Sequence, residues 1–323
     1  MQRRRRKYGC RKAGVYDSVS LYSLTLQNPL DANLAEVYKS AILPSMAVQK
    51  GTKLNRLDRE LPEGLLVDAQ WLEKRGYSRS LRSQYVAAGW LEQPARGAFR
   101  RPRGELTWEQ VVISLQSLMR FPVTVGGRTA LELLGFAHYL ARGQREVYLY
   151  GDRALPGWTS KLCLEPRLVF RSGKRLFPGL TQALPAAPLA GGTPSSSETV
   201  LPGALRALPW GHWKWPLVVS TPERAFLELL DELPHRESFH QVDALAEGLA
   251  TLSPRRLDEL LAECRSVKVK RLFLFFADRH DHPWVQRVDR SAIDLGKGKR
   301  MLVKGGTLDA RYQITVPKDL HGV

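Results

Sequence analysis

The chain has 323 residues, with 49 Lys and Arg against 32 Asp and Glu, so its formal net charge is +17. This length suits two domains, and a hydrophobic fraction of 43% is ample for a packed core. The charge indicates an anionic partner, and the absence of any apolar run of about 18 residues argues against a transmembrane span.

Residues 1–50 show no sustained helical or strand period. Their start, MQRRRRKYGCRK, lacks a following apolar region, so we do not expect a secretory signal. We predict a disordered basic tail. The cluster Arg3–Lys7 is either a flexible arm that binds DNA or part of a segment upstream of a true start at Met46.

The cysteines are three in number and widely separated. Cys10, Cys163 and Cys264 form no C-x-x-C pair, which indicates neither a disulfide framework nor a zinc site. This usage fits the reducing cytosol, so we predict a cytoplasmic protein.

Residues 51–104 are predicted to form a winged helix-turn-helix domain. Leucines at near-helical spacing predict a first helix that ends at Pro62. Asp68 is a suitable N-cap for a second helix, and Ser78 for a third that runs to about Ala88. Strands are predicted over 90–93 and 97–101, which completes the order of a winged helix.

The charged side chains of residues 74–103 in this domain are nearly all cationic. Between Lys74 and Arg103 the only acidic residue is Glu92. Helical periodicity turns Leu81 and Tyr85 toward the domain core and the polar face toward solvent. Arg can form paired hydrogen bonds with guanine and Gln with adenine. The residues assigned to base reading are Arg79, Arg82, Ser83 and Gln84. Those assigned to DNA phosphate contacts are Arg96, Arg100, Arg101 and Arg103.

The alternative for this domain is a winged helix that contacts proteins, with its arginines merely solvated. The third helix and the wing agree in the sign of their charge, which favours DNA.

Residues 105–323 are predicted to form a larger mixed α/β domain, so the fold class is α+β. Helices are predicted to begin after Thr107, Thr221 and Ser253, and the run VKVKRLFLFF is assigned to a helix. Strands are predicted over 146–150, 161–171, 216–219 and 312–316. Residues 182–208, rich in Pro, Gly, Ala and Ser, are predicted to be a surface insertion or a disordered loop.

The sequence offers little support for catalysis. The run Asp278–His282 resembles a metal-ligand cluster, but five adjacent residues at a helix end cannot all face one ion. The Gly-Lys loops over 296–300 and 304–306 do not fit the spacing of a phosphate-binding loop. The motifs G-x-S-x-G, H-E-x-x-H and G-x-G-x-x-G are absent from the sequence. We therefore predict no catalytic residue, no metal and no cofactor.

The C-terminal part is also basic. It is either a second nucleic-acid contact, a docking face for an acidic protein, or ordinary solvated surface. The residues that define this candidate surface are Lys268, Lys270, Arg271, Lys299, Arg300 and Lys304.

Several sequence blocks together resemble the AbiEi family of bacterial antitoxins. They are residues 66–99, FPVTVGGRTALELLGFAHYL from Phe121, STPERAFLELLDELP from Ser220, SPRRLDELLAECRSVKVKRLFLFFADRH from Ser253, and LVKGGTLDARYQITVPK from Leu302. The resemblance covers most of the chain from about Leu54, excepting residues 182–208.

This resemblance implies a DNA-binding winged helix followed by a larger antitoxin domain. Its DNA-reading helix corresponds to Arg79–Ala88 and its wing to Trp90–Arg101. Such proteins repress their own operon by binding inverted repeats upstream of it. They also neutralise a toxin of the nucleotidyltransferase class without a stable complex, in a two-gene abortive-infection system. No residue for the antitoxin activity carries over.

The function predicted from the sequence is therefore a non-enzymatic antitoxin and autorepressor in phage defence. One alternative is a stand-alone winged-helix regulator whose C-terminal domain senses a ligand. A second is a DNA-guided nuclease or nucleotide-modifying enzyme.

Overall fold

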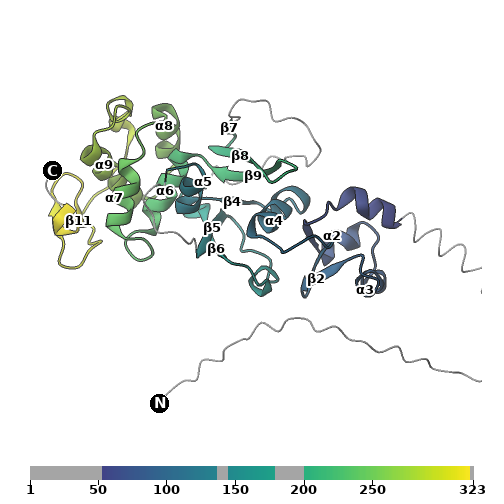
Figure 1. Ribbon diagram of the computed structural model, residues 1–323. Coiled ribbons are helices and arrows are strands. Elements are labelled where there is room, and N and C mark those ends of the chain that lie inside the picture. The colour runs from purple at the N-terminus through teal and green to yellow at the C-terminus, as the bar shows by residue number, and fades with distance from the viewer. Residues whose placement is uncertain (1–52, 137–144, 179–199, 321–323) are drawn as a thin grey trace, which may run out of the picture. The chain divides into compact units, whose positions relative to one another are not determined.

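The computed structural model describes residues 53–136, 145–178 and 200–320 (Figure 1). Helices and strands are mixed along the chain, so the predicted α+β class is confirmed. The described residues fall into two units, which divide between Glu63 and Gly64. The domain boundary predicted at residue 104 stays a prediction. The tail predicted over residues 1–50 lies outside the described residues and stays a prediction as well.

In the first unit, residues 53–60 form the helix expected before Pro62. An ion pair between Arg56 Nε and Glu60 Oε1, 2.8 Å apart, links two successive turns of this helix.

The second unit begins with the elements of a winged helix. They are β1 (Leu66–Asp68), α2 (Ala69–Lys74), α3 (Arg79–Ala87), β2 (Glu92–Ala95) and β3 (Ala98–Arg100). The strands form an antiparallel sheet in the order β1-β3-β2.

Both predicted N-caps of this region are confirmed. The carboxylate of Asp68 accepts a hydrogen bond from the Trp71 amide at 2.7 Å, and the Ser78 hydroxyl accepts one from the Leu81 amide. Strand β1 was not predicted, because three residues are too few to show a strand period. It forms through its pairing with β3, in which Val67 faces Phe99.

A six-stranded mixed sheet lies at the centre of the remaining fold. Its order is β6 (Arg167–Ser172), β5 (Glu146–Gly151), β4 (Val123–Val125), β9 (Trp215–Ser220), β8 (Leu205–Trp210) and β7 (Val200–Leu201). The predicted strands over 146–150 and 216–219 are confirmed. The strand predicted over 161–171 begins only at Arg167: residue 161 ends a 3-10 turn, Thr159–Lys161, and residues 162–166 have no regular structure.

The loop prediction for residues 182–208 is wrong at its C-terminal end. Residues 200–201 and 205–210 form β7 and β8, which pair with each other and, through β8, with β9. The Pro-Gly-Ala composition that indicated a loop makes the tight turn between these strands, where Gly203 and Ala204 have φ values of 78° and 54°. The rest of the predicted loop, residues 182–199, lies outside the described residues.

Gln116 holds the middle of this sheet together. It belongs to η1 (Ser114–Leu118), a π-helix that continues α4 (Trp108–Ile113). Its amide donates to the Val123 and Val218 carbonyls and accepts from the Val218 amide, at 2.9–3.0 Å. One buried side chain thus bridges β4 and β9 where their own pairing is limited to Val125 and Val219.

Helices pack against this sheet and against one another. They are α5 (Gly127–Leu133), α6 (Pro222–Glu232), α7 (Phe239–Glu247), α8 (Pro254–Glu263) and α9 (Val267–His280). Helix α6 contacts all four others. The predicted starts after Thr107, Thr221 and Ser253 are confirmed, as is the helix assigned to VKVKRLFLFF.

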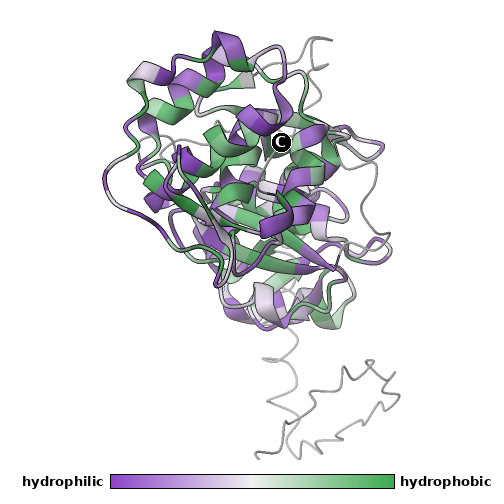
Figure 2. Ribbon diagram, turned by 90° about the vertical axis from the view of Figure 1, so that its left-hand side faces the viewer, coloured by the Kyte–Doolittle hydropathy of each residue, from purple (hydrophilic) through white to green (hydrophobic). Residues whose placement is uncertain are grey.

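The core of the helical region is aromatic. Phe226 of α6 meets Phe273 of α9 edge to face at 6.2 Å, and Trp284 stacks on Phe273 at 5.8 Å. Figure 2 shows the strands as largely hydrophobic, while the helices alternate between hydrophobic and hydrophilic stretches. This alternation is the expected pattern for helices that cover a buried sheet.

Short elements complete the chain. A hairpin joins β10 (Thr307–Asp309) to β11 (Ile314–Val316), so the strand predicted over 312–316 is confirmed in its second part. The remaining 3-10 turns are η3 (Gly173–Arg175), η4 (Val285–Arg287), η5 (Arg290–Ala292) and η6 (Lys318–Leu320). Among the described helices, none has the length and apolarity needed to cross a bilayer.

Candidate nucleic-acid interface

Helix α3 presents one polar face to solvent. The exposed residues are Arg79, Ser80, Ser83, Gln84 and Ala87. They follow the spacing i, i+1, i+4, i+5 and i+8, which is one side of an α-helix. Three of the four residues predicted to read bases, Arg79, Ser83 and Gln84, therefore lie together on an accessible face.

Arg82 does not belong to that face, and its assignment to base reading is corrected. Its residue is only 7% exposed. The guanidinium donates to the Tyr77 carbonyl at 2.8 Å and lies 5.8 Å from the ring centre of Phe99. It also approaches the Ala69 carbonyl at 3.4 Å. Arg82 therefore joins α2, the turn, α3 and β3 from inside the domain.

The burial of Arg82 has a simple physical origin. The sequence pattern turned Leu81 inward as an apolar residue, but Leu81 is half-buried and the buried face is centred on Arg82 and Tyr85. A long Arg side chain can be buried when its donors meet backbone carbonyls. With the buried face centred there, Ser80 lies on the exposed face beside Gln84. The sequence pattern did not identify Ser80.

The wing is the hairpin formed by β2 and β3. Arg96 lies at its tip, next to Gly97, whose φ of 92° permits the tight turn. Arg96 and Arg103 are exposed, and Arg101 is half-buried. Arg96 thus projects a cation from the end of a hairpin, as a phosphate contact requires.

Arg100 is not available for phosphate, and its assignment is also corrected. It is 7% exposed, and its Nε donates to Glu92 Oε2 at 2.7 Å. Its Nη2 donates to the Gly104 carbonyl at 2.6 Å. Glu92 is the one acidic residue between Lys74 and Arg103, and its carboxylate holds Arg100 across the wing.

A second polar cluster lies buried beside the central sheet, where Gly126 precedes α5. The Glu228 carboxylate of α6 accepts from the Gly127 amide at 3.0 Å, the Ser220 hydroxyl at 2.9 Å and Arg224 Nε at 2.8 Å. A Cβ on Gly126 would lie 2.1 Å from Glu228 Oε2, so only glycine fits there.

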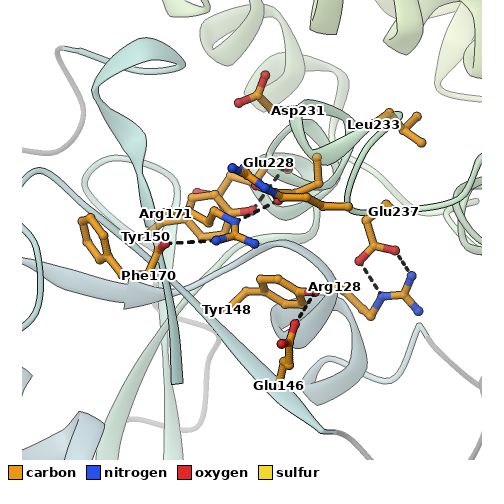
Figure 3. Close-up of polar contacts among 12 residues, drawn as sticks. Arg128, Glu146, Tyr148, Tyr150, Phe170, Arg171, Glu228, Asp231, Leu233 and Glu237 are labelled. Atoms are coloured by element: carbon orange, nitrogen blue, oxygen red, sulfur yellow. Dashed lines mark hydrogen bonds and ion pairs between the residues drawn. The ribbon is translucent and has the colours of Figure 1, made fainter. Parts of the chain in front are cut away.

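Other polar side chains near Glu228 also form ion pairs and hydrogen bonds with one another. Figure 3 shows Arg128 and Glu237 forming a two-point ion pair and Tyr148 beside Glu146. Burial raises the pKa of Tyr150 well above its usual value, and the nearby carboxylates of Glu232 and Glu228 add to the effect. Its hydroxyl therefore stays protonated and donates to the Glu228 carbonyl at 3.4 Å. These pairings make the cluster a joint between α5, α6 and the sheet.

Half of the candidate C-terminal basic surface is buried or already bonded. Lys268 donates to the Leu233 carbonyl at 2.9 Å and lies 3.2 Å from the Asp231 carboxylate. Arg271 is 2% exposed and donates to the carbonyls of Leu295 and Gly298.

Lys270 is 9% exposed, because α9 is buried along this side. Lys268, Lys270 and Arg271 therefore cannot form a docking face. The exposed members are Lys299, Arg300 and Lys304.

The run Asp278–His282 is held by its own neighbours. Arg279 and His280 both bond to Asp243 Oδ1 at 2.8 Å, and His282 bonds to the Ala246 carbonyl at 2.9 Å. Within the described ranges, no three His, Cys, Asp or Glu side chains gather as a metal site requires.

Comparisons with known proteins match both halves of the chain. A family model described as "Transcriptional regulator, AbiEi antitoxin N-terminal domain" matches residues 50–142. A second, described as "Transcriptional regulator, AbiEi antitoxin, Type IV TA system", matches residues 210–317.

Among solved structures, the crystal structure of the RV2827C protein from Mycobacterium tuberculosis is 18% identical. The alignment covers 81% of this chain and 88% of that one, with a TM-score of 0.46. No curated protein matches.

Proposed function

Since the chain belongs to the AbiEi antitoxin family of transcriptional regulators in type IV toxin–antitoxin systems, we propose that it represses its own operon by binding upstream DNA. The observation that carries this proposal is the exposed face of α3 beside the wing. That face combines a cation, hydroxyls and an amide. Between Lys74 and Arg103 the only acidic residue is Glu92, which pairs with Arg100. Side chains of these kinds read base edges in the major groove.

In this proposal, α3 enters the major groove of inverted repeats upstream of the operon. Arg79, Ser83 and Gln84 contact bases, and Ser80 lies on the same exposed face. Arg96 contacts phosphate from the tip of the wing, together with Arg101 and Arg103. Arg82 and Arg100 support this surface from within and do not touch DNA.

We further propose that residues 105–323 neutralise a partner toxin in the cytoplasm, without catalysis and without a cofactor. The proposed toxin is of the nucleotidyltransferase class, acts in abortive infection, and is neutralised without a stable complex. Of the six residues of the candidate basic surface, Lys299, Arg300 and Lys304 are exposed and would contact an acidic partner.

A paired growth and reporter assay tests both roles in one strain. The neighbouring gene is expressed with the full chain, and a reporter is placed behind the chain's own upstream DNA. The wild type is expected to rescue growth and silence the reporter. The Arg79→Ala/Gln84→Ala variant is expected to rescue growth but release the reporter, because its changes lie on the DNA-facing surface alone.

The matched control is Arg255→Ala/Gln286→Ala, which removes the same side-chain types from exposed positions outside the winged helix. This control should behave as wild type. A neighbouring gene that does not affect growth, or a wild type that does not rescue it, would refute the antitoxin role. A reporter that Arg79→Ala/Gln84→Ala still silences would refute the assignment of α3.

A further inference from the structure

A hollow of about 390 Å³ lies between α2 and the segment that follows η1. Gln70, Trp71, Lys74 and Arg75 line it from the α2 side. Leu118, Met119 and Arg120 line it from the other side. The Trp71 indole donates to the Leu118 carbonyl at 3.0 Å, so one hydrogen bond fixes the two walls together.

The hollow is cationic. Lys74, Arg75 and Arg120 contribute three positive charges, against one carboxylate, that of Asp68. The Asp68 carboxylate is engaged as the N-cap of α2. Across the described ranges, neither Lys74 nor Arg120 makes an ion pair with an acidic side chain.

Arg75 is held in place at the wall. Its guanidinium lies 3.7 Å from the ring centre of Trp71, and its Nη1 donates to the Trp71 carbonyl at 3.3 Å. Stacking on an indole fixes the plane of a guanidinium. The orientation of this cation is therefore set before a ligand arrives.

The backbone beside the hollow is unusual twice. The π-helix η1 ends at Leu118, and Arg120 has a φ of 49°. A π-helix is rare and is frequent at functional sites, and left-handed backbone is unfavourable for a residue with a long side chain. Glycine adopts this φ without strain. A role in binding a ligand would explain why arginine, and not glycine, occupies this position.

We propose that this hollow binds a phosphate group through Lys74, Arg75 and Arg120. Three cations that line one hollow from two segments attract an anion, and guanidinium groups match the oxygens of a phosphate. In the complex with DNA, the ligand is a backbone phosphate next to the stretch that α3 contacts; this part rests on the proposed function. The other source of the same chemistry is the phosphate of a free nucleotide.

The test uses the full chain and a variant that keeps the backbone, Lys74→Ala/Arg120→Gly. The affinity for a labelled duplex of the chain's own upstream DNA is measured across a series of KCl concentrations. The hollow is proposed to hold one phosphate, and each phosphate contact that is lost reduces the log–log salt slope by about 0.9, so the slope of the variant should fall by about 0.9. The control Arg255→Ala/Lys318→Ala removes two exposed cations elsewhere and should leave the slope unchanged.

A second arm distinguishes the sources of phosphate. Calorimetric titration with ATP and with inorganic phosphate compares the wild type with the same variant. A reduced salt slope assigns the hollow to DNA, and a loss of ATP or phosphate binding assigns it to a small ligand. The proposal is overturned if the variant, shown by circular dichroism to be folded, changes neither result.

The two arms also separate this proposal from the preceding one. A wild type that does not bind its upstream duplex refutes the proposed repression of the operon. The ATP and phosphate titrations still decide whether the hollow binds phosphate.

Discussion

Replacing Glu228 by Ala is expected to lower the free energy of unfolding by about 3–5 kcal/mol, the usual cost of removing one partner from a buried ion pair. Arg224 and Glu228 are 2% and 1% exposed and lie 2.8 Å apart. Without the carboxylate, the Arg224 guanidinium stays buried with an unpaired charge. The Gly127 amide and the Ser220 hydroxyl lose their acceptor as well.

The matched control is Glu259→Ala. Arg255 and Glu259 have the same i, i+4 spacing in α8 and lie 3.2 Å apart, but their side chains are 90% and 64% exposed. An exposed helical pair of this kind contributes about 0.3–0.5 kcal/mol. Urea unfolding of the full chain, followed by circular dichroism, measures both variants. Equal losses would show that the Glu228 cluster does not hold the sheet and helices together.

Arg82→Ala is expected to destabilise the winged helix by roughly 1.5–3 kcal/mol, the range for a hydrogen bond that involves a charged group. The change leaves the Tyr77 carbonyl without its donor at 2.8 Å and removes the guanidinium beside Phe99. Urea unfolding of the full chain measures this loss. Any loss of DNA affinity should then follow the loss of folded protein.

Arg79→Ala is the control from the same helix, because Arg79 is exposed. A substitution at such a surface position changes stability by about 0.5 kcal/mol or less. If Arg82→Ala proved as stable as Arg79→Ala while binding DNA more weakly, Arg82 would be a base-contacting residue after all.

The elements that the sequence predicted well are those with local chemical markers. Asp68 and Ser78 cap their helices through their own side chains, and Thr107 forms the capping box with Gln110 that its spacing predicts. A cap depends on residues within one turn, so the local sequence contains all the information required.

Elements that depend on distant partners were missed or misplaced. Strands β1 and β7 have three and two residues, and each exists because another strand lies beside it. The apolar residues of β4 are equally few, and the strand is joined to β9 by Gln116 from a neighbouring helix. No local period records such contacts.

The candidate site shows the same limit. Charge and helical periodicity assigned Arg79 and Arg82 to DNA contacts, and charge assigned Arg100. The structure separates them, because Arg82 and Arg100 find acceptors inside the fold while Arg79 stays exposed. Sequence periodicity could not show this, since a buried arginine is distinguished by the carbonyls that it meets.

The proposed repression requires the exposed face of α3 to read the operon's own DNA. The most direct measurement compares the affinity of the full chain for its upstream duplex with that for a scrambled duplex, in the wild type and in Arg79→Ala/Gln84→Ala. The wild type should prefer its own duplex, and each lost base contact should reduce that preference by about 1–3 kcal/mol. Equal affinity of the wild type for both duplexes, or an unchanged preference in the variant, would show that this face of α3 does not read the operon's DNA.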